Sequence, residues 1–136
     1  MPIHIEPYDS LELTVFRGSG DVSFKDITDS LYRFYESVDA DPTPKALWDL
    51  KNANLDQVSE ENLALLPRLV SRKVEKRRGG KTAIVTSRET DHALVQLLVI
   101  YCKYLPIAIL GFTSRRRALA WLGVDDSEIK LFGRRR

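Results

Sequence analysis

The sequence of 136 residues contains little cysteine and little histidine, and both shortages limit the chemistry that it can carry. Its one cysteine, Cys102, excludes an intramolecular disulfide and a cysteine-rich zinc site, and it fits a reducing compartment. The two histidines, His4 and His92, do not have the i, i+4 spacing of a metal-binding helix. We therefore predict no metal site, no cofactor and no Cys–His nucleophile.

Long apolar runs are also missing. The longest near-continuous apolar stretch, residues 93–102, contains Gln96 and has about half the length that a membrane-spanning helix needs. The first residues lack a basic start followed by a long apolar region, so we predict neither a signal peptide nor a transmembrane segment. Together with the single cysteine, these features predict a cytoplasmic protein.

The charge of the chain is close to balanced. The formal net charge is +2, and Arg134–Arg136 supply three of the positive charges, which leaves −1 for the rest. A near-neutral body gives no strong nucleic-acid signal, because such binders carry a domain-wide basic excess. Residues 68–81 form a basic run without aromatic residues, which is typical of a solvated helix face but could also dock an acidic partner, a membrane surface or RNA. The composition predicts one domain over residues 1–133 and a basic tail at 134–136.

Hydrophobic periodicity predicts alternating strands and helices. The expected strands are residues 3–8, 11–17, 46–50, 81–87 and 107–112, and the expected helices are residues 23–40, 59–78, 90–105 and 114–122. A further short extended piece is expected at 129–132. This order predicts an α/β fold with a mixed, mostly parallel five-stranded sheet, an N-terminal antiparallel hairpin and four flanking helices.

Glycine, proline, serine and threonine residues set the expected boundaries of the strands and helices. Gly18 and Gly20 are expected to break the chain after the second strand. Ser59 is the expected N-cap of the second helix, and Pro67 is expected to kink or restart that helix. Ser87 or Thr90 is expected to cap the third helix, since either residue can accept a backbone hydrogen bond.

The segment order and several packing motifs resemble a known family. The motifs are Leu47-Trp48-Asp49-Leu50 followed by Asn52, Ala53 and Leu55, the strand Gly80-Lys81-Thr82-Ala83-Ile84-Val85, and Ala118-Leu119-Ala120-Trp121-Leu122-Gly123. With these motifs the chain resembles the SpoIIAA-like family of STAS-type domains over nearly its whole length. The resemblance implies a compact module related to anti-sigma-factor antagonists and similar in shape to CRAL-TRIO-type lipid carriers.

The resemblance also implies a possible phosphorylation site. The antagonists carry an Asp-Ser-Ser-like element at the start of the helix after the third strand, and a kinase phosphorylates the serine. Ser59 is the nearest counterpart here, without the Asp-Ser pair. A phosphate on Ser59 would gain from the helix N-terminus, but Asp56, Glu60 and Glu61 would offset that gain. A plain N-cap role for Ser59 is the alternative.

Polar residues gather where the parallel strands end, which is the usual ligand site of an open α/β sheet. The candidate anion-binding residues are Lys51, Asn52, Arg88, His92, Ser114 and Arg115. Free N–H groups at a helix N-terminus, with two arginines nearby, could hold a small anion. The alternative is an ordinary set of polar loops, because every such sheet gathers them at this edge.

The third expected helix is more apolar than one layer of a sheet requires. Apolar side chains between Leu94 and Cys102 point in nearly all directions, whereas a covering helix needs only a stripe of about 100°. A neighbouring helix, a second copy of the protein or an apolar ligand could cover the remainder. The expected homodimer or ligand face comprises Leu94, Leu97, Leu98 and Tyr101.

These observations lead to three hypotheses about function. The first is a non-catalytic STAS-like interaction or regulatory module that self-associates through helix 90–105. The second is a carrier of a small apolar or acyl ligand, with an anionic headgroup at the carboxyl edge of the sheet. The third is an enzyme that uses His92, for which the sequence suggests no reaction.

Overall fold

The computed structural model describes residues 2–37 and 41–133, so the predicted basic tail at 134–136 lies outside the described residues. The described chain forms five strands, five α-helices and two short 3-10 turns at Asp9–Leu11 and Lys73–Arg77. The strands are β1 (Ile3–Tyr8), β2 (Leu13–Asp21), β3 (Lys45–Asn54), β4 (Lys81–Val85) and β5 (Ala108–Phe112). The helices are α1 (Phe24–Tyr35), α2 (Glu60–Val70), α3 (Glu89–Tyr101), α4 (Arg115–Leu122) and α5 (Asp126–Gly133).

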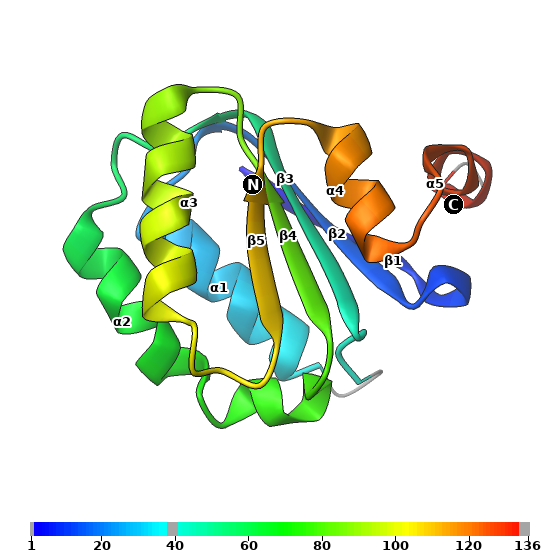
Figure 1. The fold of residues 1–136 in the computed structure, drawn as a ribbon, viewed down its shortest axis with the longest axis horizontal. Helices are drawn as coiled ribbons and strands as arrows, with labels where there is room; N and C mark the ends of the chain where they lie inside the picture. Colours follow the sequence, from blue (N-terminus) through cyan, green and yellow to red (C-terminus); the bar gives the residue numbers. More distant parts are fainter. Residues whose placement is uncertain (1, 38–40, 134–136) are drawn as a thin grey trace.

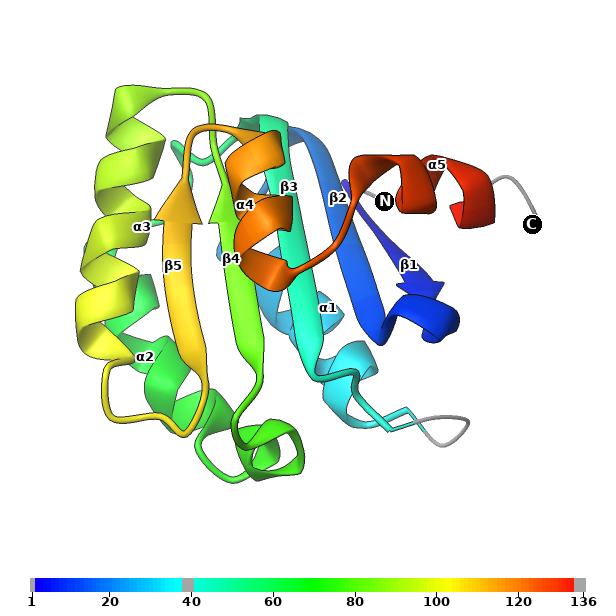
Figure 2. The same ribbon diagram turned by 45° about the vertical axis from the view of Figure 1, so that its right-hand side comes forward.

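The strands form one mixed sheet in the order β1-β2-β3-β4-β5 (Figure 1). β1 is antiparallel to β2, and every other neighbouring pair is parallel. Helices α1, α2 and α3 cover one face, whereas α4 covers the other face and α5 lies beside β1 (Figure 2). Each crossover advances one strand in the same direction, so crossovers of one hand place their helices on the same face. The predicted fold class is confirmed.

Each face of the sheet has its own apolar core. On the α1–α3 face, Phe16 stacks on Trp48 with 4.1 Å between ring centroids, and Phe34 meets Phe16 edge-on at 5.1 Å. On the α4 face, Leu47 and Leu119 are buried among aliphatic side chains of the central strands. Successive side chains of a strand point to opposite faces, so the near-continuous apolar run of β3 serves both cores.

Serine caps begin three of the helices. Ser23 Oγ accepts the Asp26 N–H at 3.1 Å, and Asp26 accepts the Ser23 N–H at 2.9 Å, which forms a capping box. Ser59 and Ser114 cap α2 and α4 in the same way through their hydroxyl oxygens. The Ser59 cap is where the sequence predicts it, because capping depends on residues within one helical turn.

The second and third strands are longer than expected. β2 starts at Leu13 and continues through Gly18 and Gly20 to Asp21, because its last residues pair with the end of β3. A Cβ atom on Gly18 would lie 2.7 Å from Leu50 Cδ2, so glycine permits this close approach rather than breaking the strand. β3 reaches Asn54 for the same reason.

Several helices also differ from expectation. α1 ends at Tyr35, and the end predicted for it at residues 38–40 lies outside the described residues. α2 continues past Pro67 without restarting there and ends at Val70, and a separate 3-10 turn, Lys73–Arg77, follows in place of the helix expected to residue 78.

The extended piece expected at 129–132 is part of α5, so five helices flank the sheet instead of four. Asp125 starts α5, since its carboxylate accepts the Ser127 N–H at 3.0 Å while Glu128 accepts the Asp125 N–H at 3.1 Å. The N-cap of α3 is Arg88, and α3 ends at Tyr101 rather than near residue 105.

Candidate functional site

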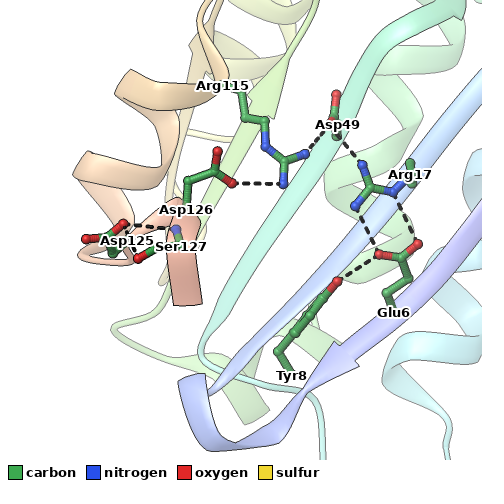
Figure 3. A network of polar contacts seen from close by, with 8 residues as sticks. All are labelled: Glu6, Tyr8, Arg17, Asp49, Arg115, Asp125, Asp126 and Ser127. Carbon is green, nitrogen blue, oxygen red and sulfur yellow. Dashed lines mark hydrogen bonds and ion pairs between the residues drawn. The ribbon is translucent and has the colours of Figure 1, made fainter. Parts of the chain in front are cut away.

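An aspartate stands between two arginines on the α4 face of the sheet (Figure 3). Asp49 lies in β3, and its side chain is only 11% exposed. Its Oδ2 is 2.6 Å from Arg115 Nη1 at the start of α4 and 3.6 Å from Arg17 Nη1 on β2. A buried carboxylate needs such partners, because desolvation penalises an unpaired charge. The carboxylate of Asp49 therefore neutralises positive charge on Arg115 that could otherwise bind an anion.

The network continues in both directions from this carboxylate. Arg17 donates to Glu6 through Nε at 3.2 Å and Nη2 at 3.1 Å, and the Tyr8 hydroxyl donates to Glu6 at 3.0 Å. On the other side, Arg115 Nη2 reaches Asp126 at 3.5 Å. The hydrogen bond to Glu6 raises the pKa of Arg17. Alternating charges thus fasten α4 and α5 to the sheet and compensate one another.

A second charge cluster lies at the N-terminus of α3. Arg88 Nη2 forms an ion pair with Asp56, and it reaches Asp91 Oδ1 at 3.2 Å and Thr90 Oγ1 at 3.3 Å. The hydrogen bond from Arg88 lowers the pKa of Asp56. Burial raises the pKa of Asp91, although the charge of Arg88 opposes this shift. Two carboxylates therefore share the one guanidinium.

The six predicted anion-site residues divide between the two faces of the sheet. Arg88 and His92 lie at the start of α3, whereas Ser114 and Arg115 lie at the start of α4 on the opposite face (Figure 2). Within the described chain, His92 Nδ1 is buried without a hydrogen-bond partner. The arginines thus do not converge on one anion from the same side, and an anion site here stays a prediction.

The two remaining predicted anion-site residues lie within β3 rather than in a loop. Lys51 and Asn52 are both exposed near the carboxyl end of that strand. The Ser87 hydroxyl donates to the Lys51 carbonyl at 2.8 Å, which ties the end of β4 to β3. Ser114 Oγ accepts the Arg117 N–H at 3.3 Å, so its hydroxyl oxygen is used as a helix cap.

Helix α3 directs part of its apolar surface inward. Val95 is buried against the sheet, and Leu94 and Leu98 line an apolar cavity of about 100 Å³ that α1 and α2 also enclose. The Thr82 hydroxyl is buried on β4 and, among the described residues, has no hydrogen-bond partner. A neighbouring helix of the same chain therefore covers Leu94 and Leu98, half of the expected dimer face.

The outer side of α3 remains open. Leu97 is half-buried, Tyr101 is 37% exposed and Ile100 is 59% exposed. Tyr104, in the turn after α3, is 88% exposed. An open groove of about 570 Å³ runs along this side of the helix. Its lining residues are Ser87, Glu89, His92, Ala93, Gln96, Leu97, Ile100 and Thr113.

Strand β5 continues this open surface at the edge of the sheet. Leu110 points to the α4 face of β5 and is 41% exposed, because α4 lies mainly over β4. Neither proline nor a charged residue occurs in β5. We define the α3/β5 surface as Gln96, Leu97, Ile100, Tyr104, Ala108 and Leu110. The sequence indicated its helical half through the excess of apolar residues in α3, but gave no sign that β5 would be an open edge.

Two solved structures are similar to this fold over most of the chain. An uncharacterized protein of the DUF3478 family with a SpoIIAA-like fold, from Shewanella loihica, is 18% identical with a TM-score of 0.53, covering 88% of this chain and 91% of its own. The anti-sigma factor antagonist SpoIIAA in its unphosphorylated form is 12% identical with a TM-score of 0.57, covering 91% of this chain and 99% of its own. The chain has a SpoIIAA-like fold. No family model and no curated protein sequence matches it.

Within the SpoIIAA-like fold, the candidate phosphorylation site is a helix cap. Ser59 Oγ accepts the Asn62 N–H at 3.1 Å, and Asn62 Oδ1 accepts the Ser59 N–H at 3.0 Å. The Ser59 residue is exposed at the start of α2. The predicted N-cap role is confirmed, and phosphorylation of Ser59 stays a prediction.

The described residues contain no group of three or more His, Cys, Asp or Glu side chains placed to hold a metal ion. None of the helices within that same part of the chain is long and apolar enough to cross a membrane.

Proposed function

We propose that the chain is a non-catalytic interaction module of regulatory type, and that its partner at the α3/β5 surface is a second copy of itself. The polar side chains at the carboxyl edge of the sheet are used largely in pairing with one another, with Asp49 between two arginines and Arg88 between two carboxylates. The apolar side chains of the α3/β5 surface, by contrast, remain open to solvent. The exposed Ile100 beside an open sheet edge is the observation that carries the proposal.

A second exposed apolar patch on α1 and α2 is a weaker candidate. Tyr32 is 62% exposed there, but Lys73 lies 4.5 Å above its ring and also pairs with Glu36. Lys25 and Asp29 form a further ion pair on the same helix. These charges keep water at the patch, since a charged group is costly to bury. The α3/β5 surface has fewer charges near its centre.

Sedimentation velocity over a micromolar concentration series tests the proposal. Replacing Ile100 with Glu removes its burial and places a charge at the interface twice per dimer. Covering an exposed aliphatic side chain fully contributes about 1.5–3 kcal/mol. We therefore expect dimerisation of Ile100→Glu to weaken by about 2 kcal/mol or more, roughly 30-fold in Kd.

Leu65→Glu is the matched control, because Leu65 is 47% exposed on α2, away from the proposed interface. We expect this variant to dimerise like the wild type. A wild-type protein that remains monomeric throughout the series would overturn self-association. Equal weakening by Ile100→Glu and Leu65→Glu would assign dimerisation to another surface.

The apolar cavity beside α3 supports one alternative, the binding of a small apolar ligand. Its volume of about 100 Å³ and the buried Thr82 hydroxyl suit a small molecule better than an acyl chain, since ligand pockets usually measure about 300–1,000 Å³. Any headgroup would face Arg88, because Arg115 lies on the opposite face of the sheet. Mass spectrometry of an organic extract of the purified protein tests this alternative, and an extract without a stoichiometric ligand would argue against it.

A further inference from the structure

β5 is an unprotected edge of the sheet. It is the last strand in the order, and it pairs only with β4. The other edge, β1, contains Pro7, which removes one backbone donor and discourages pairing with another chain. The sequence of β5, AILGF, has no such protection.

The hydrogen bonds of β5 establish which backbone groups remain open. The Ala108 N–H donates to the Gly80 carbonyl at 2.9 Å, and the Phe112 carbonyl accepts the Thr86 N–H at 3.0 Å, so both residues point toward β4. Alternate residues of a strand direct their backbone groups to opposite sides. Ile109 and Gly111 therefore point away from the sheet, and no described residue of the chain pairs with their N–H and C=O groups.

These open groups are self-complementary. We infer that β5 pairs antiparallel with β5 of a second copy, with Leu110 facing its own counterpart across the two-fold axis. This inference rests on the proposed self-association. Ile109 then exchanges both backbone hydrogen bonds with Gly111 of the second copy, and Gly111 does so with Ile109, which makes four bonds in all. With Leu110 at the centre, all five residues of β5 pair with β5 of the second copy. A register centred on Ile109 or Gly111 would pair fewer residues.

Charges on α3 fit the same two-fold arrangement. Gln96 lies against β5, since its Oε1 is 3.2 Å from where a Cβ on Gly111 would lie. Glu89, seven residues before Gln96, lies on the same side of α3, and Lys103 lies in the turn just after the helix ends at Tyr101. A two-fold axis brings the N-terminal end of one α3 beside the C-terminal end of the other. Glu89 of one copy then faces Lys103 of the second copy, and opposite charges favour that pairing over a parallel one.

Apolar side chains flank the paired edge on both faces of the sheet. Leu110 lies on the α4 face, and Ile100 lies on the α3 face. Burial of both layers is needed, because a stable interface covers about 800 Å² on each partner and a strand edge alone is narrower than that. The joined sheet would have ten strands, five from each copy.

Cysteine cross-linking tests the register. Directly opposed residues of a non-hydrogen-bonded antiparallel pair have Cα atoms about 4.5 Å apart, which a disulfide can bridge. We expect Leu110→Cys to form a disulfide-linked dimer rapidly under mild oxidation at micromolar concentration. Ala108→Cys is the matched control, since Ala108 is exposed on the same face of β5 but would lie opposite Phe112. The buried native Cys102 is present in both variants.

A charge exchange provides an independent check of the orientation. Glu89→Lys and Lys103→Glu should each weaken dimerisation severalfold in sedimentation, and the double variant should regain most of the wild-type affinity. A wild-type dimer in which Ala108→Cys cross-links as readily as Leu110→Cys, or in which Leu110→Cys does not cross-link, would overturn this pairing and leave self-association standing. A wild-type monomer would overturn both.

Discussion

Replacing Arg77 with Ala should strongly destabilise the fold, although Arg77 belongs to a basic run that resembles a solvated helix face. Arg77 is only 3% exposed. Its guanidinium donates to the carbonyls of Thr43 at 2.8 Å, Pro44 at 3.2 Å and Lys81 at 3.0 Å, and to the Tyr35 hydroxyl at 3.0 Å. It therefore joins the segment before β3 to the start of β4 and to the end of α1.

The expected loss follows from the acceptors left behind. No described carboxylate lies within ion-pair distance of Arg77, so the carbonyl dipoles and the Tyr35 hydroxyl hold its charge. Each buried acceptor without a donor costs about 1–3 kcal/mol, partly recovered where water enters. We expect Arg77→Ala to lower the free energy of unfolding by about 3–5 kcal/mol, which is a fifth or more of the usual stability of about 5–15 kcal/mol for a domain.

Urea and thermal unfolding followed by circular dichroism measure this loss. For a chain of this size, Tm should fall by roughly 12–20 °C. Arg78→Ala is the matched control, because Arg78 is exposed and pairs with Glu75 at 2.6 Å on the surface. We expect that control to stay within about 0.5 kcal/mol of the wild type. If Arg77→Ala and Arg78→Ala proved equally mild, the structural role of Arg77 would be refuted.

Three further outcomes follow from the same structure. Ser59→Ala should lower the free energy of unfolding by about 1 kcal/mol through loss of the α2 cap, while Ser59→Asp should stay near the wild type; equal stability of all three in urea unfolding would contradict the cap. Burial raises the pKa of the Cys102 thiol to about 11, so iodoacetamide at pH 8 should label this thiol only after unfolding. Mass spectrometry measures the rate of labelling, and equal rates for native and denatured protein would contradict the burial of Cys102. Burial also raises the pKa of Asp91, so its contribution to stability is present in acid and is lost as pH rises through the folded pKa. The free energy of unfolding of Asp91→Asn, measured with urea relative to that of the wild type, should therefore be higher at neutral pH than in acid. A difference between the two proteins that stays constant with pH, or changes in the opposite direction, would contradict this.

Local chemistry accounts for what could be predicted without coordinates. Ser59 and Ser114 begin helices because their hydroxyls accept hydrogen bonds within one turn, and Gly123 ends α4 in the left-handed region at φ 75°. The order of strands and helices follows from hydrophobic period, which is also local. α5 was missed, although the Asp125–Glu128 capping pair was a usable signal.

Contacts between distant segments needed the tertiary structure. Arg115 and Asp49 are 66 residues apart, and they meet only because α4 crosses back over β3. In the sequence, Arg77 cannot be distinguished from its exposed basic neighbours. Only the tertiary structure shows that the segment before β3 covers its side chain. Arg88 and Arg115 both follow strands, yet they lie on opposite faces, because α3 leads to another strand and α4 does not.

From residue patterns alone one could predict the order of the five strands and first four helices, the Ser59 cap and an apolar excess on α3. Which side chains of α3 remain exposed, and that β5 is an open edge beside them, depended on the tertiary structure. These two kinds of feature differ because the effects that set them act over different distances along the chain. Period and capping act within a few residues, whereas exposure depends on which other elements of the chain cover a surface.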